Sequence, residues 1–432
     1  MSSSVQVTNS PAIKNAPLEG LAEGNGYFSN RVLLALILGV PYFLKKWTPI
    51  VRYGGFKTYW FIVILLALPI TIGDVLDIME MRHDWASFQF TPELFKYVFT
   101  RLIPDVIFHT QSQDETQVRD HYDRGDDFYG WFLGPRMVYT SGVILDPTRK
   151  ETLEELQDNK LALVCNKLDL KPEDRLLDIG CGWGTLVTFA AKNFGCDVTG
   201  VTLSKHQTAF GTERIKNNGV SHDKARILCC DYRDIPDGPG QFTKIVALEM
   251  AEHVGIRRYG TFLKQVYDLL DDQGTFVLQV AGIRQDWQFE DLIWGLFMNK
   301  YIFPGADASC SLAWVVNQVE KAGFEVKNID VLGVHYSATI YRWYQNWVSN
   351  KDKVIDAYGE RWYRIWVFFL AYSTIISRRK TDLSYYYFSQ GSFSLFQLTL
   401  RKNLNAVHRI EGIPSHTSLY GMRKTDCLYK TG

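Results

Sequence analysis

The chain has 432 residues, of which 46% are hydrophobic and 14% aromatic, and its formal net charge at pH 7 is zero. This length accommodates one large domain with additions, or two domains. The lack of a basic excess argues against nucleic acid as a partner. The seven cysteines show no paired metal-ligand spacing, so we expect reduced, buried thiols and no metal.

Residues 1–30 are rich in Ser, Asn, Ala and Gly, a composition typical of a disordered tail. Two apolar segments follow at 32–44 and 59–72, with basic residues between them. Both are shorter than the about 20 residues of a spanning helix. We therefore expect residues 31–80 to form a membrane-anchoring hairpin that re-enters or lies on the membrane. The catalytic domain is expected in the cytosol, and the membrane is expected to be that of the endoplasmic reticulum. The alternative is a pair of soluble core helices, and the number of crossings stays open.

Residues 81–148 are expected to form a helical cap in front of the main domain. The most distinctive run of this segment begins at His121 and has the sequence HYDRGDDFYGWFLG. Aromatic and charged residues mix there as they do on an amphipathic helix that packs against a core.

The most informative segment is RLLDIGCGWG at 175–184. A short apolar strand leads to Asp178, and glycines follow at every second position, Gly180, Gly182 and Gly184. Glycines in such a turn permit positive φ and a close approach of the backbone to a ligand. Because Thr185 stands where the dinucleotide fingerprint continues, the pattern favours the S-adenosylmethionine loop of a class I methyltransferase.

Strands and helical patterns alternate after this loop. We expect a helix at 185–194 and strands at 197–204, 225–230, 244–248 and 275–280. This alternation predicts an α/β fold with a doubly wound, Rossmann-like sheet and a ligand at the carboxyl ends of the strands. The cofactor-binding core is accordingly expected at 149–285.

Polar residues at the strand ends are the expected ligand contacts. Thr202, Ser204 and Gln207 would bind ribose hydroxyls, since no carboxylate ends the second strand. Asp231 would accept a hydrogen bond from the amine of an adenine, and Tyr232 would stack on its ring.

Residues 286–410 are expected to hold a lipid-binding cap and the last strands of the sheet, and residues 411–432 a tail. Aromatic rings crowd 336–372, where they would line an acyl-chain tunnel; core packing is the alternative for each ring taken singly. The pattern at 361–376 predicts a cap helix. The pattern at 384–402 predicts two strands that close the sheet in antiparallel fashion.

Six motifs occur in order along the chain: HYDRGDDFYGWFLG, VYTSG, LLDIGCGWG, VTLSKHQ, EMAEHVG and HYSATIYRW. In this combination residues 115–405 resemble the cyclopropane-fatty-acid-synthase family of lipid methyltransferases. With the expected N-terminal hairpin and the run DLIWGLFMNKYIFPGADAS at 291–309, the chain looks most similar to the fungal sphingolipid C9-methyltransferases of that family. The resemblance implies S-adenosylmethionine as cofactor and a membrane lipid as substrate. It implies cofactor contacts at Tyr139, Thr140, Asp178, Gly180, Gly182, Trp183, Thr202, Ser204, Gln207, Asp231 and Tyr232.

The same resemblance implies catalytic roles for Glu252 and Tyr336. Family members that make cyclopropane rings hold a bicarbonate ion between Cys, Glu, His and Tyr side chains. Here Ser141 stands at the cysteine position and Gln279 at the histidine position. The sequence therefore leaves open whether bicarbonate binds.

An isolated alkene is a weak nucleophile, so its methylation needs a strong electrophile held close to it in a dry site. Methyl transfer leaves a carbocation on the neighbouring carbon, which anionic groups and aromatic rings stabilise. Glu252 is the expected base, directly or through water, with a pKa raised by apolar surroundings. Other residues expected around the substrate and its cation are Tyr122, Phe128, Ser141, Gln279 and Tyr336.

Loss of a proton from the methylated carbon gives a branched alkene, whereas loss from the new methyl group closes a cyclopropane ring. We expect the first outcome, with methylation at C9 of the Δ8-unsaturated sphingoid base of ceramide or glucosylceramide. The alternatives are a cyclopropane synthase that acts on cis-unsaturated phospholipid chains and an inactive lipid-binding scaffold. The oligomeric state stays open.

Overall fold

The computed structural model describes residues 92–102, 125–236, 238–283, 285, 289–377 and 393–402. These residues belong to one compact unit. The expected tails at 1–30 and 411–432, the expected hairpin at 31–80 and Tyr122 lie outside the described residues. Within the described ranges, every helix is too short or too polar to cross a membrane.

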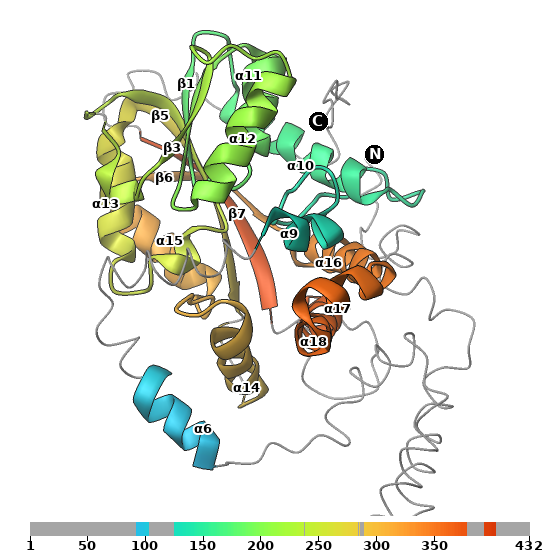
Figure 1. The fold of residues 1–432 in the computed structure, drawn as a ribbon. Coiled ribbons are helices and arrows are strands. Elements are labelled where there is room, and N and C mark those ends of the chain that lie inside the picture. Colours follow the sequence, from blue (N-terminus) through green and yellow to red (C-terminus); the bar gives the residue numbers. More distant parts are fainter. Residues whose placement is uncertain are drawn as a thin grey trace, which may run out of the picture. The chain divides into compact units, whose positions relative to one another are not determined.

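A seven-stranded sheet forms the centre of the protein, in the order β3-β2-β1-β4-β5-β7-β6 (Figure 1). The strands β1 to β5 pair in parallel, and β7 runs antiparallel to both β5 and β6. This arrangement confirms the expected α/β class and doubly wound sheet. The bounds are β1 Arg175–Ile179, β2 Asp197–Thr202, β3 Ala225–Cys229, β4 Phe242–Leu248, β5 Leu270–Ile283, β6 Glu325–Val331 and β7 Phe393–Arg401.

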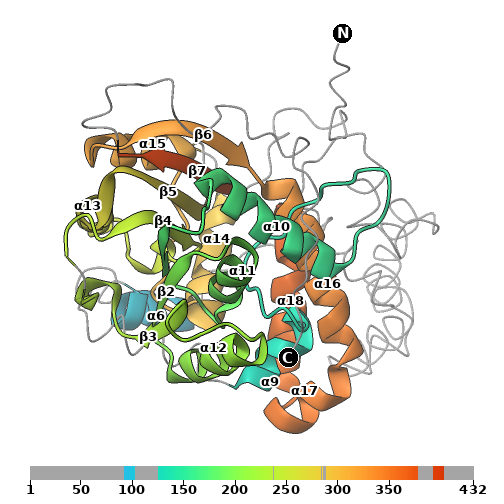
Figure 2. The same cartoon turned by 90° about the horizontal axis from the view of Figure 1, so that it is seen from above.

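Helices cover both faces of the sheet (Figure 2). One face carries α10 (Leu153–Leu168), α11 (Thr185–Phe194) and α12 (Lys205–Asn217), and the other carries α13 (Tyr259–Leu269) and α15 (Leu312–Lys321).

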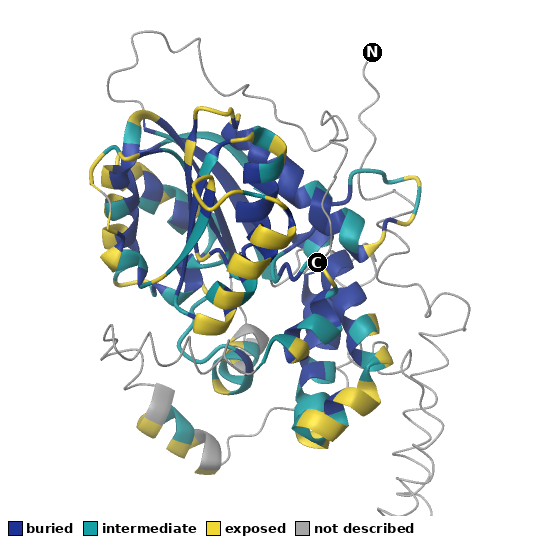
Figure 3. Cartoon of the chain, turned by 45° about the horizontal axis from the view of Figure 1, so that its top comes forward, coloured by how far each residue is buried: buried dark blue, intermediate teal, exposed yellow. Residues whose placement is uncertain are grey.

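Neighbouring residues of one strand point to opposite faces. Leu176 packs in the apolar cluster with α10 and α11, whereas Leu177 packs in the cluster with α13 and α15. Because both faces are buried, the central strands are nearly continuous apolar runs. Figure 3 shows this burial through the sheet and on the inner sides of the helices that flank it.

The remaining helices form the cap and its connections. In the cap, α16 packs against α9 and α18, and α17 packs against α18. Their bounds are α9 Asp126–Leu133, α16 Gly333–Ser349, α17 Lys351–Tyr358 and α18 Glu360–Ile376. The other described helices are α6 Pro92–Tyr97, α14 Phe289–Phe297, the π-helices η2 Val98–Leu102 and η5 Met298–Ile302, and the 3-10 helices η3 Tyr232–Asp234 and η4 Ala251–His253.

The sheet closes differently from the sequence-based prediction. The antiparallel direction of β7 is confirmed, but its outer partner is β6, a strand that was not predicted from the sequence. Residues 384–392, where a partner strand was expected, lie outside the described residues. β6 was missed because polar residues interrupt its apolar ones and most of the strand is only partly buried.

Phe128 belongs to the core of the cap. Its ring is fully buried, with ring centroids 5.0 Å from both Trp347 and Trp366. Phe128 is not among the described residues that line the cavity at the carboxyl ends of β1, β2 and β4, and its expected place near the substrate cation stays a prediction. An amphipathic helix buries its aromatic face, and α9 does so against α16 and α18.

Candidate active site

The carboxyl end of β1 leads into the glycine loop and α11, as predicted. Gly180 and Gly182 have φ of 81° and 53°, which glycine adopts without steric strain. A Cβ at Gly180 would lie 2.7 Å from Cγ and 2.8 Å from Cβ of Met250, whereas a Cβ at Gly182 would meet no protein atom within 4 Å. The loop is thus tightly packed at Gly180 and open at Gly182.

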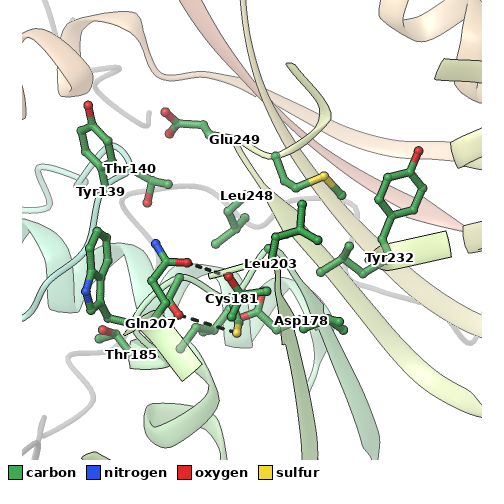
Figure 4. A pocket seen from close by; sticks show the side chains of 18 of the residues that line it. Tyr139, Thr140, Asp178, Cys181, Thr185, Leu203, Gln207, Tyr232, Leu248 and Glu249 are labelled. Carbon is green, nitrogen blue, oxygen red and sulfur yellow. Dashed lines mark hydrogen bonds between the residues drawn. The ribbon is translucent and has the colours of Figure 1, made fainter. Parts of the chain in front are cut away.

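A cavity lies against this loop at the carboxyl ends of β1, β2 and β4 (Figure 4). Ligands of open α/β sheets bind at such strand ends. In Figure 4, Tyr139, Thr140 and Glu249 lie on one side of the cavity, and Asp178 and Gln207 lie on the other. Of the predicted cofactor contacts, those that line the cavity are Tyr139, Thr140, Asp178, Gly180, Gly182, Trp183, Thr202, Gln207, Asp231 and Tyr232.

Ser204 is the predicted contact that does not line the cavity. Its hydroxyl is fully buried and accepts a hydrogen bond from the backbone N–H of Gln207 at 3.2 Å, as the N-cap of α12. The Thr202 hydroxyl donates to Oε1 of Gln207 at 2.6 Å. Ser204 therefore starts the helix that carries Gln207, and Thr202 orients the Gln207 amide.

Asp231 and Tyr232, the expected adenine contacts, line the cavity next to each other. The Asp231 carboxylate accepts hydrogen bonds from Nε and an Nη of Arg233, both at 2.7 Å. The backbone N–H of Arg233 also donates to this carboxylate at 2.9 Å. A carboxylate offers about four acceptor positions, so these three donors leave about one position for a ligand amine. The Tyr232 ring packs edge-on against Phe262 with a centroid distance of 5.4 Å.

The cap is tied directly to the glycine loop. Nε1 of Trp183 donates to Oδ1 of Asp126 at 2.7 Å, and the Trp183 ring lies 4.9 Å from that of Tyr129. Both partners come from α9, so the HYDRGDD run helps to hold the loop in place.

Lys160 is a buried cavity residue that was not predicted from the sequence. Its ammonium group donates to the Thr140 hydroxyl. Burial lowers the pKa of Lys160 to about 8, although the negative charges of Glu249 and Asp178 raise it in part. Burial raises the pKa of Asp178 to about 7, against the opposing charge of Lys160.

Glu249 was also missed; it lines the cavity together with Asp178 and Asp231. Its Oε1 accepts hydrogen bonds from the backbone N–H of Ser141 at 3.0 Å and from Nε2 of Gln279 at 2.7 Å. Its Oε2 accepts from the Tyr336 hydroxyl at 2.8 Å. The structure thus brings Ser141, Gln279 and Tyr336 together as predicted, but around Glu249.

The amide of Gln279 is itself held in place. Gln397 on β7 donates to its Oε1 at 2.6 Å, which turns its Nε2 toward Glu249. The carbonyl of Gln279 accepts from the backbone N–H of Glu249 at 2.7 Å. β5 and β7 therefore position the donors on one side of the Glu249 carboxylate.

Glu252 is buried next to this cluster, in η4. Its Oε1 accepts from the backbone N–H of Ala281 at 2.5 Å, and its Oε2 has no hydrogen-bond partner among the described residues. Burial and the charge of Glu249 raise the pKa of Glu252 to about 8. Two close carboxylates that share one buried site favour a single negative charge. Glu249, with three donors on its carboxylate, is the better holder of that charge.

Position along the chain could have identified Glu249. It follows directly after β4, and functional groups of doubly wound sheets lie at the carboxyl ends of the central strands. Glu252 was predicted instead because the resemblance pointed to the acidic residue of EMAEHVG that precedes His253. The catalytic role of Glu252 stays a prediction.

The histidines His253 and His335 lie outside the carboxylate cluster. His253 lines the cavity, and its ring lies 6.3 Å from that of Phe303. Nδ1 of buried His335 accepts a hydrogen bond from the backbone N–H of Ile144 at 3.0 Å. Burial lowers the pKa of His335 to about 4 from 6.5, so the folded protein keeps this imidazole neutral.

His335 should make the protein sensitive to acid. Between pH 6.5 and 4 the unfolded chain binds a proton at this imidazole that the folded chain does not, so stability falls as the pH falls. The expected loss is about 3 kcal/mol, at about 1.36 kcal/mol per pKa unit. Urea unfolding of the wild type and of His335→Gln at pH 7 and 4.5 measures it. The variant should lose less stability on acidification; equal losses would contradict the assignment.

Comparison with known proteins shows which family the chain belongs to. Residues 109–385 match the family described as mycolic acid cyclopropane synthetase. Sphingolipid C9-methyltransferase 2 of Gibberella zeae is 50% identical to the chain, over 96% of this chain and 89% of its own length. The sphingolipid C9-methyltransferase of Komagataella phaffii is 49% identical over 98% of both chains.

Solved structures share the fold. The cyclopropane synthase MmaA2 from Mycobacterium tuberculosis matches with a TM-score of 0.59 and 26% identity, over 67% of this chain and 98% of its own. The mycolic acid cyclopropane synthase CmaA1, complexed with SAH and CTAB, matches with a TM-score of 0.60 and 27% identity over the same shares. The chain therefore belongs to the mycolic acid cyclopropane synthetase family of S-adenosylmethionine-dependent methyltransferases.

Proposed function

We propose that this protein transfers a methyl group from S-adenosylmethionine to C9 of the Δ8-unsaturated sphingoid base of a ceramide or glucosylceramide. The observation that carries the proposal is the identity of about half of all positions, over nearly the whole chain, with several proteins named sphingolipid C9-methyltransferase. The carboxylate cluster at the cavity supports it, because alkene methylation needs anionic groups beside the reacting carbons.

The residues of the cavity fit S-adenosylmethionine. Gly182 leaves space for a close approach of the ligand to the loop, and Asp231 and Tyr232 suit an adenine. Gln207 would bind the ribose. When bound, the cofactor supplies an electrophilic methyl group on a positively charged sulfur. The carboxylates of Asp178 and Glu249 line the same cavity and favour a cationic ligand over a neutral one.

Aromatic side chains connect the cavity with the outer part of the cap. The Tyr139 ring lies 5.9 Å from Phe303, which lies 6.0 Å from Phe369 of α18. At the far end, Trp294 of α14 stacks on Tyr372 at 4.2 Å. We propose that the hydrocarbon chains of the lipid follow this aromatic surface, where apolar burial favours them.

The residues around Glu249 suit a reaction through a cation. The π electron pair of the C8=C9 bond would form the new bond between C9 and the methyl carbon, while the bond from that methyl group to sulfur breaks and its electron pair stays on sulfur; the positive charge develops at C8. Tyr336 lies against the cluster and Tyr139 lines the cavity, so their rings and the Glu249 carboxylate can stabilise this charge. Loss of the proton on C9 restores the double bond and gives the 9-methyl product.

The main alternative is a cyclopropane synthase that acts on cis-unsaturated phospholipids. The shared fold with two cyclopropane synthases favours it, whereas the full-length relatives favour the sphingolipid. An inactive lipid-binding scaffold would have no need for a buried, hydrogen-bonded carboxylate that faces the cavity, since such a group costs stability.

A lipid panel with a CD3-labelled methyl donor tests the proposal. The panel contains a ceramide and a glucosylceramide with a Δ4,Δ8 base, and a cis-monounsaturated phospholipid, and mass spectrometry identifies the products. We expect a CD3 group on a sphingolipid, because proton loss at C9 keeps all three labels. A CD2-containing ring on the phospholipid would contradict the proposal.

We also propose that the protein works at the membrane of the endoplasmic reticulum with its catalytic domain in the cytosol. Its proposed substrate is a membrane lipid, and its cofactor is made in the cytosol. Cell fractionation with organelle markers, followed by protease treatment of intact microsomes, tests both parts. Recovery in the soluble fraction, or protection of the domain inside the microsomes, would contradict them.

A further inference from the structure

Three hydrogen-bond donors converge on the carboxylate of Glu249, and the same carboxylate borders the cavity. We propose that Glu249 is the catalytic base of this enzyme and that its carboxylate takes the place of the bicarbonate ion of the cyclopropane-forming relatives. This inference rests on the proposed function, because the proposed function decides which carbon loses the proton. It does not depend on which lipid carries the alkene.

The residues do not fit a bound bicarbonate. The positions expected to surround that anion are Ser141, Glu252, Gln279 and Tyr336, and three of them already donate to Glu249. A bound bicarbonate could not use these three hydrogen-bond donors, because Glu249 already accepts from them. It would also lie beside one or two buried carboxylates in low dielectric, where like charges repel strongly.

Contacts distinguish Glu249 from Glu252 as the base. Glu249 reaches the cavity, whereas Glu252 is not among the described residues that line it. Buried Lys160, which also lines the cavity, adds a positive charge that favours the ionised form of Glu249. The hydrogen-bond donors and the Lys160 charge lower the pKa of Glu249, but burial outweighs them and raises this pKa above 4.5. A carboxylate that is ionised and more basic than usual suits proton abstraction.

The backbone supports a functional role. Glu249 has φ of 57°, one of three described residues other than glycine with positive φ. Such a conformation is strained for glutamate and persists where the surroundings hold it. Here the carbonyl of Gln279 binds the Glu249 N–H, and the Gln279 amide binds its carboxylate. If residue 249 served only to form the turn, glycine would be expected there, because glycine adopts this φ without strain.

Proton transfer from C9 to Glu249 completes the reaction. After C9 has gained its methyl group, C8 is electron-deficient. A carboxylate oxygen of Glu249 forms a bond to the hydrogen on C9, and the C9–H electron pair becomes the new C8=C9 π bond. The product is neutral at these carbons, and Glu249 is left protonated. The proton must then pass to solvent before the next turnover.

Glu249→Gly tests the role directly, because glycine relieves the strain at φ 57° and leaves a space bounded by the Ser141 amide, Gln279 and Tyr336. We expect turnover to fall by about 10²–10⁴-fold, the usual contribution of a general base. Added formate or bicarbonate should restore at least part of it by filling that space. Wild-type turnover should be unchanged in buffer freed of carbon dioxide.

Glu249→Gln is the matched variant, since its amide fills the space and cannot take up the proton. It should be as inactive as Glu249→Gly but should gain nothing from formate. Both variants should bind S-adenosylhomocysteine within a few-fold of the wild type, which shows that the cofactor site is folded. Rescue of the glycine variant alone is a result that a merely structural role would not produce.

Three outcomes would overturn the inference: near-normal turnover by Glu249→Gly, bicarbonate dependence of the wild type, or an inactive Glu252→Gln beside an active Glu249→Gln. All variants are assayed on the lipid that the wild type methylates. If that lipid is a phospholipid, the proposed substrate is wrong, and the rescue by formate still decides the role of Glu249.

Discussion

Gly180→Val is expected to weaken the binding of S-adenosylmethionine strongly. Residue 180 has φ of 81°, and a Cβ there would lie within 2.8 Å of two Met250 side-chain atoms. One of these is Cβ of Met250, which is fixed to the backbone and cannot swing away. Strain of about 1–3 kcal/mol adds to this clash, and each about 1.4 kcal/mol is a tenfold change in affinity. Calorimetric titration should show a loss of about 100-fold or more.

Gly219→Val is the control for this variant. Gly219 also has positive φ, 71°, but a Cβ there would meet no atom within 4 Å, and the residue does not line the cavity. Gly219→Val should lower the melting temperature and leave cofactor affinity within a few-fold. If Gly180→Val kept normal affinity, the assignment of the cofactor to this loop would be refuted.

Local pattern was enough to predict the cofactor half of the protein. The glycine loop, α11 and the parallel strands all rest on apolar runs bounded by turn residues, which are visible within about 10 residues of sequence. Gly180, Asp231 and Tyr232 line one cavity because strand ends meet at one edge of the sheet. Ser204 caps α12 and does not line the cavity; sequence alone does not separate these roles, because the same residue type caps helices and binds ligands.

The last strands and the site carboxylate depend on contacts that are distant in sequence. β6 carries Asn328 and Asp330 among its apolar residues, and its pairing with β7 brings together segments about 70 residues apart. The donors to Glu249 come from positions 141, 279 and 336. The resemblance identified these three residues, but only the folded chain shows that they surround Glu249.

The cap shows a similar division. Burial of Phe128, Trp347 and Trp366 with one another supports the core alternative for these rings. Phe303 and Phe369 instead connect the Tyr139 side of the cavity with α18 and, through Trp294, with α14. Sequence alone could not separate the two groups, because Trp366 and Phe369 lie three positions apart in the same helix, α18, and yet belong to different groups.

Tyr336→Phe is expected to reduce turnover and to shift its pH dependence upward. The Tyr336 hydroxyl donates to Oε2 of Glu249 at 2.8 Å and so favours the charged carboxylate. Removal of this donor raises the pKa of Glu249 further, so more of it is protonated at neutral pH. A hydrogen bond to a charged group contributes about 1.5–3 kcal/mol, which corresponds to about one to two pKa units.

The measurement is kcat/KM against pH for the wild type and Tyr336→Phe. Activity should fall as the pH falls through the pKa of Glu249, and this acid limb should move upward by about one to two units in the variant. The other titratable groups near Glu249, which are Lys160, Asp178 and Glu252, are the same in both proteins. Tyr344→Phe, on the same helix and away from Glu249, controls for the loss of a tyrosine hydroxyl and should leave the limb in place. An unshifted limb in Tyr336→Phe would mean that the titrating base is another group, and Glu252, whose pKa is about 8, would then regain the role.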